Sequence, residues 1–195
     1  MGKANRISAK KLGKYKSFRA LSTNPKTQLS FYKSKNVLEQ ILTFVKQSPN
    51  TFSTTCKGLA REHFEDFLSE PPSGMLCDHV DSEGKQYRQV AAKYTSKGKY
   101  GTWEHLQPSR RWDYLLLVHL DFKGPSYYRL SREKFNELCE LGIIKKYRSR
   151  QQESQHTEYR YSLNKRTSFK GRPETFLKFA EPINKRSMPR RLAES

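Results

Sequence analysis

The sequence predicts an α/β domain with basic extensions at both ends, and two observations support this fold class. Residues 112–120 form a nearly continuous apolar run, which is typical of a strand that is buried on both faces. Apolar residues recur at helical spacing around residues 37–45, 53–68 and 131–141, so amphipathic helices are expected to flank the strands. A chain of 195 residues is long enough for one domain with a real core.

The expected elements begin after a basic arm. Residues 1–35 contain ten Lys or Arg and no Asp or Glu, which is typical of a segment that contacts phosphates. A helix is expected near residues 37–45, ending at Pro49 and Asn50. A second helix is expected to begin near Ser53, with Ser53 or Thr54 as its cap, and to stop before residues 71–74.

The remaining elements include most of the expected strands. Residues 75–80 and 85–95 should form a hairpin around a turn at 81–84, because Gly84 suits a tight turn. A basic loop (96–111), the buried strand (112–120) and a short strand (127–130) follow. Ser131 is expected to cap a helix that Gly142 closes, and residues 143–150 and 159–163 should form two more strands. These patterns predict an arm (1–35), a core (36–165) and a basic extension (166–195).

The charge of the chain indicates its class of partner. Lys and Arg number 38 against 19 Asp and Glu, for a formal net charge of +19. A polyanion, and most simply a nucleic acid, is the expected partner. Cys56, Cys77 and Cys139 form no Cys-x-x-Cys pair, which argues against a zinc ribbon, and their odd number is consistent with a reducing cytoplasm. No apolar run is long enough for a membrane span, so no membrane partner is expected.

One constellation suggests hydrolytic chemistry. Asp78 and Asp81 follow one strand of the expected hairpin, and Lys93 lies on the other. Phosphodiester hydrolysis needs a divalent metal, and Mg²⁺ prefers carboxylate oxygens as ligands. A lysine beside the metal can orient the attacking water and stabilise charge. Acids before a glycine turn are common, however, so the pattern is weak without its context.

The context resembles the PD-(D/E)XK nuclease superfamily, and within it the type II restriction endonuclease-like proteins. The resemblance covers residues 53–141 and lies in the 58–62 helix, the 78–84 turn, the 90–93 strand and the 112–118 strand. It implies a restriction endonuclease-like core, a mixed central sheet flanked by helices. It also implies a Mg²⁺-dependent phosphodiester hydrolase of a restriction system, bacterial or phage and cytoplasmic, that cleaves double-stranded DNA. The implied roles are metal ligand for Asp78, with Asp81 as its competitor, catalytic lysine for Lys93 and accessory acid for Glu62.

One position departs from that pattern. The resemblance implies a second acid two residues before the lysine, where this chain has Ala91, and alanine cannot bind metal. Either this copy is an inactive variant, natural or engineered, or the acid comes from another position such as Glu62. A single change of Ala91 to Glu would restore the motif, which favours an engineered form. Gln89, one pleat away on the same face, is a weak candidate ligand.

Further residues are candidates for DNA contact. Cations in the 96–111 loop can meet phosphates, and its polar and aromatic side chains can reach base edges, unless Trp103 belongs to the core. The DNA-binding candidates are Lys97, Lys99, Trp103, His105, Gln107, Arg110, Arg111, Lys145 and Arg148. A homodimer is expected, because a palindromic site matches a two-fold axis.

Two alternatives need no catalysis. The expected helix 131–141 and the two strands after it are similar to a winged helix-turn-helix, although that fold needs two more helices directly upstream. A ribosome-associated RNA-binding protein would use only the basic tails. These readings leave the Asp78 to Lys93 hairpin without a chemical role.

Overall fold

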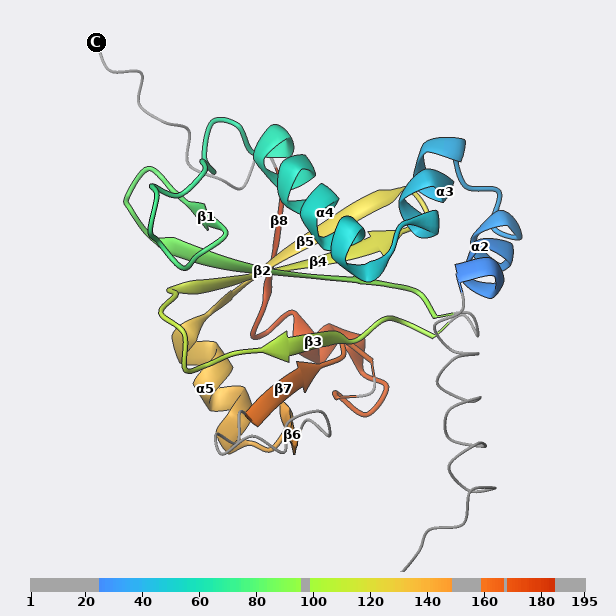
Figure 1. Cartoon of the computed structure of the whole chain (residues 1–195). Helices are drawn as coiled ribbons and strands as arrows, with labels where there is room; N and C mark the ends of the chain where they lie inside the picture. The colour runs from blue at the N-terminus through green and yellow to red at the C-terminus, as the bar shows by residue number, and fades with distance from the viewer. Residues whose placement is uncertain (1–24, 96–98, 149–158, 167, 185–195) are drawn as a thin grey trace, which may run out of the picture.

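The computed structural model describes residues 25–95, 99–148, 159–166 and 168–184. It is a mixed α/β fold built on a mixed five-stranded sheet, in the strand order β1-β2-β4-β5-β8 (Figure 1). Strands β2 and β4 run parallel, and the other neighbours are antiparallel. The expected α/β class is thereby confirmed. The elements are α2 (Pro25–Lys33), α3 (Glu39–Lys46), α4 (Pro49–His63), β1 (His79–Val80), β2 (Gln86–Lys93), β3 (Trp103–Leu106), β4 (Tyr114–Asp121), β5 (Gly124–Ser131), α5 (Arg132–Glu140), β6 (Lys145–Arg148), β7 (Tyr159–Leu163), α6 (Pro173–Phe176) and β8 (Glu181–Ile183).

Strand β4 is the centre of the fold, as its apolar run predicts. Leu116, Val118 and Leu120 point into one core, whereas Leu115 and Leu117 point into another. Successive side chains of a strand alternate between its two faces, so an apolar residue at every position requires cover on both sides. The two cores therefore lie on opposite faces of the same sheet.

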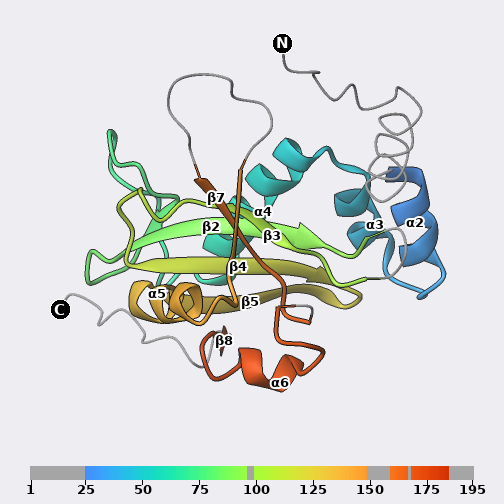
Figure 2. The same cartoon turned by 90° about the horizontal axis from the view of Figure 1, so that it is seen from below.

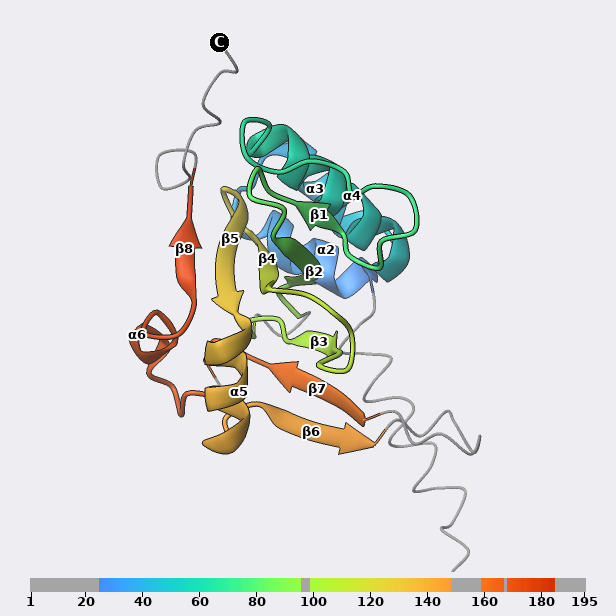
Figure 3. The ribbon, with the colours of Figure 1, turned by 90° about the vertical axis from the view of Figure 1, so that its left-hand side faces the viewer.

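Helices α2, α3 and α4 cover the first face (Figures 1 and 3). Ser48 begins α4 by accepting a hydrogen bond from the backbone N–H of Thr51, and Pro49 occupies the first turn. The expected start near Ser53 is therefore wrong, since Pro49 opens this helix instead of ending the previous one. A proline suits the first helical turn because the N–H that it lacks has no partner there.

The second face is covered by α5, α6 and a separate three-stranded sheet in the order β3-β7-β6 (Figure 3). Ser131 caps α5 through a hydrogen bond from the N–H of Lys134, as the sequence predicts. The two strands expected after this helix are present as β6 and β7, and they pair antiparallel. The winged-helix alternative is not supported, because β4 and β5 occupy the positions before α5 where it needs helices.

Several elements lie where loops or tails are expected. Helix α2 falls inside the predicted arm, yet its Tyr32 is completely buried. Strand β3 lies inside the expected 96–111 loop, and α6 and β8 lie inside the predicted extension, where Phe176 is also completely buried. Parts of both predicted extensions thus complete the core. Within the described residues, no helix has both the length and the apolar character needed to cross a membrane.

Candidate functional site

Asp78 lies just before β1, and its carboxylate is almost fully enclosed. The side chain is only 7 % exposed, and Lys57 of α4 forms an ion pair with it at 2.6 Å. The guanidinium of Arg88 lies 3.7 Å away, and the backbone N–H of Gln89 donates a hydrogen bond of 2.8 Å. The negative charge of Asp78 is therefore balanced by two cations of the chain itself.

Asp81 holds the hairpin turn together. Its carboxylate accepts hydrogen bonds from the N–H groups of Glu83 and Lys85 at 3.0 and 2.9 Å, and from the hydroxyl of Tyr87 at 3.1 Å. An Asp that binds backbone N–H groups two and four residues later is a common device for closing a turn. Both oxygens are thus occupied, and Gly84 supplies the positive φ of 76° that the turn needs.

Lys93 points toward the end of helix α3. Its Nζ donates hydrogen bonds to the carbonyl oxygens of Val45 and Gln47 at 2.9 and 3.1 Å, and lies 4.9 Å from the centre of the Phe52 ring. Burial lowers the pKa of Lys93 to about 8, because a desolvated ammonium group loses its hydration. The side chain thus ties β2 to α3.

Asp78 and Lys93 are consequently far apart along β2. The carboxylate of Asp78 meets the strand at Gln89, which precedes Lys93 by four residues. At about 3.3 Å per residue, four residues of a strand span roughly 13 Å. The structure therefore brings Asp78 together with Lys57, Arg88 and Gln89, and not with the predicted catalytic lysine.

Gln89 and His79 form a buried polar pair beside Asp78. His79 is completely buried and Gln89 is 4 % exposed, and a hydrogen bond of 2.9 Å joins His79 Nε2 to Gln89 Oε1. Within the described residues, His79 Nδ1 and Gln89 Nε2 have no hydrogen-bond partner. Burial lowers the pKa of His79, so the neutral imidazole is favoured. Ala91, two residues beyond Gln89, packs against the first core.

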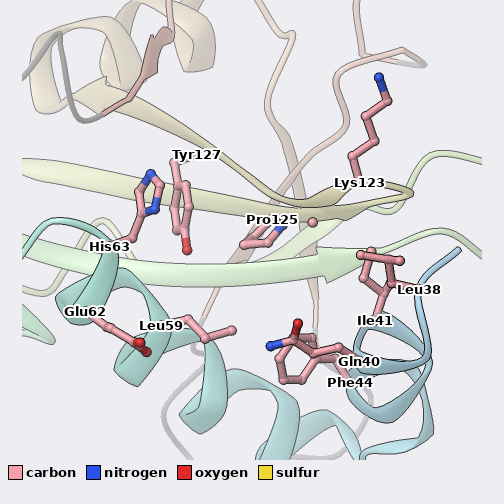
Figure 4. Close-up of a pocket in the computed structure, with 11 residues that line it drawn as sticks. Leu38, Gln40, Ile41, Phe44, Leu59, Glu62, His63, Lys123, Pro125 and Tyr127 are labelled. Atoms are coloured by element: carbon pink, nitrogen blue, oxygen red, sulfur yellow. The ribbon is translucent and has the colours of Figure 1, made fainter.

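Glu62 belongs to a different part of the surface. It lines a pocket of about 320 Å³ between α3, α4 and the connection from β4 to β5 (Figure 4). His63 stacks on Tyr127 in this pocket, with ring centres 5.3 Å apart. Asp78 does not line this pocket, and the lysine among its lining residues is Lys123. Figure 4 shows Glu62 beside Leu59 on the same helix, α4.

The predicted DNA-contacting residues have several different environments. Trp103 is completely buried, and its indole N–H donates to the carbonyl of Val118 at 2.8 Å, so it is out of reach of a base edge. Lys99, His105 and Arg111 are exposed. The remaining predicted positions are Gln107 and Arg110, which are half-buried, Lys145 and Arg148, which lie on β6, and Lys97, which lies outside the described residues.

Arg132, which no sequence motif marks as functional, fixes the 107–112 segment. Its guanidinium donates to the carbonyl oxygens of Pro108 and Arg110, both at 2.6 Å, and to that of Trp112 at 3.2 Å. It also lies 3.8 Å from the centre of the Trp112 ring. Arg110 and Arg111 are thus presented on a segment with a fixed backbone.

The side chains around Asp78 can be compared with the ligands that the expected Mg²⁺ ion requires. In the described parts of the chain, no group of three or more His, Cys, Asp or Glu side chains is arranged to hold an ion. Of the two predicted ligands, Asp78 is neutralised by Lys57, and both oxygens of Asp81 accept hydrogen bonds within the hairpin. A Mg²⁺ centre requires several oxygen ligands, so these side chains do not fit one, and binding of Mg²⁺ stays a prediction.

Comparison with known proteins assigns the chain to no family. No protein-family model matches it, and no curated protein matches it.

Proposed function

We propose that the chain is a restriction endonuclease-like protein that binds double-stranded DNA and, in its present form, does not cleave it. The observation that carries this proposal is the environment of Asp78, where Gln89 and Ala91 lie on the neighbouring strand and Lys57 neutralises the acid. The net charge of +19 supports the nucleic acid as partner, because Lys and Arg release counterions from phosphates.

The geometry favours a different match to the nuclease pattern from the one that the sequence suggests. The pattern has a second acid and a lysine two residues apart, beside the first acid. The N–H of Gln89 donates a hydrogen bond to Asp78, so Gln89 lies at the position of the second acid. Ala91, two residues later, then lies at the position of the lysine. Neither residue bears a carboxylate or an amine. Under this match the chain lacks both groups, whereas a match to Ala91 and Lys93 lacks only the acid.

Two sets of substitutions distinguish these matches. Gln89→Glu combined with Ala91→Lys places an acid and a lysine beside Asp78, whereas Ala91→Glu relies on Lys93. Nicking of a supercoiled plasmid with millimolar Mg²⁺ is the measurement. We expect the double variant to gain Mg²⁺-dependent nicking, and the wild-type chain and Ala91→Glu to show none. Adding Asp78→Asn to the double variant is the control and should abolish the gain.

Binding is tested separately from cleavage. We expect a fluorescent DNA duplex to bind the wild-type chain, with an affinity that falls steeply as salt rises. Mg²⁺-dependent nicking by the wild-type chain that Lys93→Ala abolishes would overturn the non-cleaving proposal. A strong preference for RNA would support the ribosome-associated alternative. Light scattering with and without DNA tests the expected homodimer.

A further inference from the structure

A completely buried histidine, His119, lies near the end of β4. Because side chains alternate along a strand, His119 shares the face of Leu115 and Leu117, which point into the second core. Its ring stacks on that of Tyr100, with ring centres 3.6 Å apart, and meets the Tyr94 ring at right angles at 4.8 Å. The imidazole is therefore enclosed by the chain that leads from β2 into β3.

Two hydrogen bonds fix the protonation state of this imidazole. The backbone N–H of Gly101 donates to Nε2 of His119 at 3.2 Å, so Nε2 carries no proton. In a neutral ring the proton then lies on Nδ1, which donates to the carboxylate of Asp121 at 3.1 Å. The hydroxyl of Ser126 also donates to Asp121 instead of to the imidazole, so these side chains do not form a nucleophile and its base. The ring acts as a hydrogen-bond acceptor for Gly101.

The 99–102 segment connects the two sheets. Figures 2 and 3 show β3 and β7 on the second face of the central sheet. On the side of the smaller sheet, the amide of Asn164, just after β7, donates to the carbonyl oxygens of Tyr100 and Gly101 at 2.9 and 3.1 Å. On the side of the central sheet, Gly101 bonds His119 and lies so close to β2 that a Cβ atom would collide with the carbonyl oxygen of Lys93. The hydrogen bond from Gly101 to His119 is thus a direct link between the sheets.

The groups around His119 favour its neutral form. Burial lowers the pKa of His119, because the charged imidazolium would lose its hydration, and this effect outweighs the attraction of Asp121. Lys165, just after β7, also acts against a positive charge on the ring. Burial raises the pKa values of Tyr94 and Tyr100, so both hydroxyls stay uncharged and supply no counter-charge. The neutral imidazole that accepts from Gly101 is therefore the form that the closed structure stabilises.

We propose that His119 makes an acid-sensitive link between the two sheets, and that its protonation releases the 99–102 segment from the central sheet. A proton on Nε2 would face the N–H of Gly101, and two donors cannot bond each other. The segment then moves away from the ring and exposes the imidazole to water, while Asn164 still holds it to the smaller sheet. This link goes beyond the proposed DNA binding and needs no ligand.

The direction of the pH effect follows from the two states of the ring. A released imidazole has its ordinary pKa of 6.5 and binds a proton more readily than the enclosed one. The link therefore contributes fully above this pH, and its contribution is lost as the pH falls through the acidic range. A released histidine is favoured roughly 25-fold more at pH 5 than at pH 7, which is the upper limit of the effect.

Amide hydrogen exchange resolved by residue tests the link in the wild-type chain. Protection factors, corrected for the intrinsic pH dependence of exchange, are compared at pH 7 and pH 5. We expect protection of residues 100–102 to fall by about 10-fold or more, and that of residues 115–118 in β4 to change by less than about 2-fold. Equal protection of residues 100–102 at both pH values would overturn the proposal. A fall that spreads evenly over the central sheet would also overturn it, because His79, at the hairpin, is completely buried too.

Two substitutions separate the two hydrogen bonds of the ring. In His119→Gln the amide oxygen takes the place of Nε2 and accepts from Gly101 without titrating, so residues 100–102 should stay protected at both pH values. In His119→Asn the shorter amide reaches only Asp121, so these residues should be poorly protected at both. His63→Gln, which changes an exposed histidine, is the matched control and should keep the wild-type pH dependence. The same pH dependence in a folded His119→Gln protein would overturn the proposal.

NMR of the wild-type imidazole needs no variant and decides the matter should both substitutions prevent folding. The nitrogen chemical shifts of His119 should show a proton on Nδ1 and none on Nε2 at pH 7, as the bond from Gly101 requires. On acidification, protonation of Nε2 should coincide with the loss of protection at residues 100–102. A proton on Nε2 at pH 7, or protonation that leaves the protection of Gly101 unchanged, would contradict the link.

Discussion

The ammonium group of Lys93 donates a hydrogen bond of 2.9 Å to the carbonyl oxygen of Val45, one of the last carbonyls of helix α3. A second bond, to Gln47, completes the contact. The carbonyls at a helix C-terminus lack partners within the helix and carry partial negative charge, so a cation is favourable there. The most conspicuous candidate for a catalytic lysine is therefore a link between the sheet and the first helical layer.

This link predicts a specific dependence of stability on pH. Burial lowers the pKa of Lys93 to about 8 in the folded chain, below its ordinary value of 10.5. Between these values the unfolded chain binds more protons at this site, so its contribution makes the free energy of unfolding rise with pH. Below pH 8 the contribution is constant. Cys56, the neighbouring titratable group, has its pKa raised to about 12 by burial and stays neutral in this window.

The Lys93→Met variant tests that dependence. Urea unfolding of both proteins is measured from pH 7.5 to 10.5, where ionisations that they share cancel in the difference. We expect the free energy of unfolding of the wild-type chain to rise relative to that of Lys93→Met across the window, by up to about 2 kcal/mol after allowance for partial exposure. Parallel pH profiles would show that the amine is not desolvated in the folded state.

Asp78→Asn separates a structural carboxylate from a metal ligand. Asparagine keeps the size of the side chain but leaves Lys57 without its counter-charge. We expect the free energy of unfolding to fall by about 2 kcal/mol, which is less than for a fully buried pair because Lys57 is partly exposed. Asp66→Asn, an exposed acid just after α4, is the control and should change little.

Thermal melting with millimolar Mg²⁺ completes this test. A ligand that binds only the folded state raises the melting temperature. We expect Mg²⁺ to leave the melting temperatures of the wild-type chain and Asp78→Asn unchanged. An increase in the wild-type chain that Asp78→Asn abolishes would establish Asp78 as a metal ligand.

The parts of the fold that the sequence predicts are those with local causes. The apolar run of β4, the turn at Gly84 and the cap at Ser131 each depend on a few neighbouring residues. Strand β3 has no local signature, because its Trp103 pairs with Leu163, sixty positions away along the chain. No local pattern contains such a pairing. For the same reason, the basic segment around Phe176 contains no local sign that this side chain belongs to the core.

The separation of Asp78 from Lys93 follows from the register of the hairpin. The hairpin pairs His79 with Tyr87 and Val80 with Gln86, so counting back one more pair places Asp78 opposite Arg88. The turn predicted at 81–84 makes this count possible from the sequence alone. The count places Lys93 too far along β2 to share a site with Asp78. The direction of the Lys93 side chain was not predictable, because it depends on where α3 packs.

The hydrogen bonds of Arg132 are expected to hold the backbone of the 107–112 segment in place. Lysine at this position cannot reach three carbonyl oxygens in different directions, and it loses the planar contact with Trp112. We expect Arg132→Lys to lower the free energy of unfolding by about 2 kcal/mol and to speed amide exchange at residues 109–111. Lys134→Ala, two residues further along α5, is the control. Unchanged exchange in Arg132→Lys would show that the segment is held by other contacts.

Two glycines predict opposite effects of the same substitution. A Cβ atom at Gly101 would collide with the carbonyl oxygen of Lys93, whereas one at Gly58, in the interior of α4, would meet nothing within 4 Å. The N–H of Gly101 also donates to Nε2 of His119 at 3.2 Å, so a shift of this backbone would break a buried hydrogen bond. Gly101→Ala is expected to lower the free energy of unfolding by about 3 kcal/mol through overpacking.

Gly58→Ala is expected to raise the free energy of unfolding by about 0.5 to 1 kcal/mol, because alanine loses less conformational freedom than glycine when a helix forms. Urea unfolding of both variants measures the two signs in one experiment. Equal effects would contradict the close approach of residue 101 to β2.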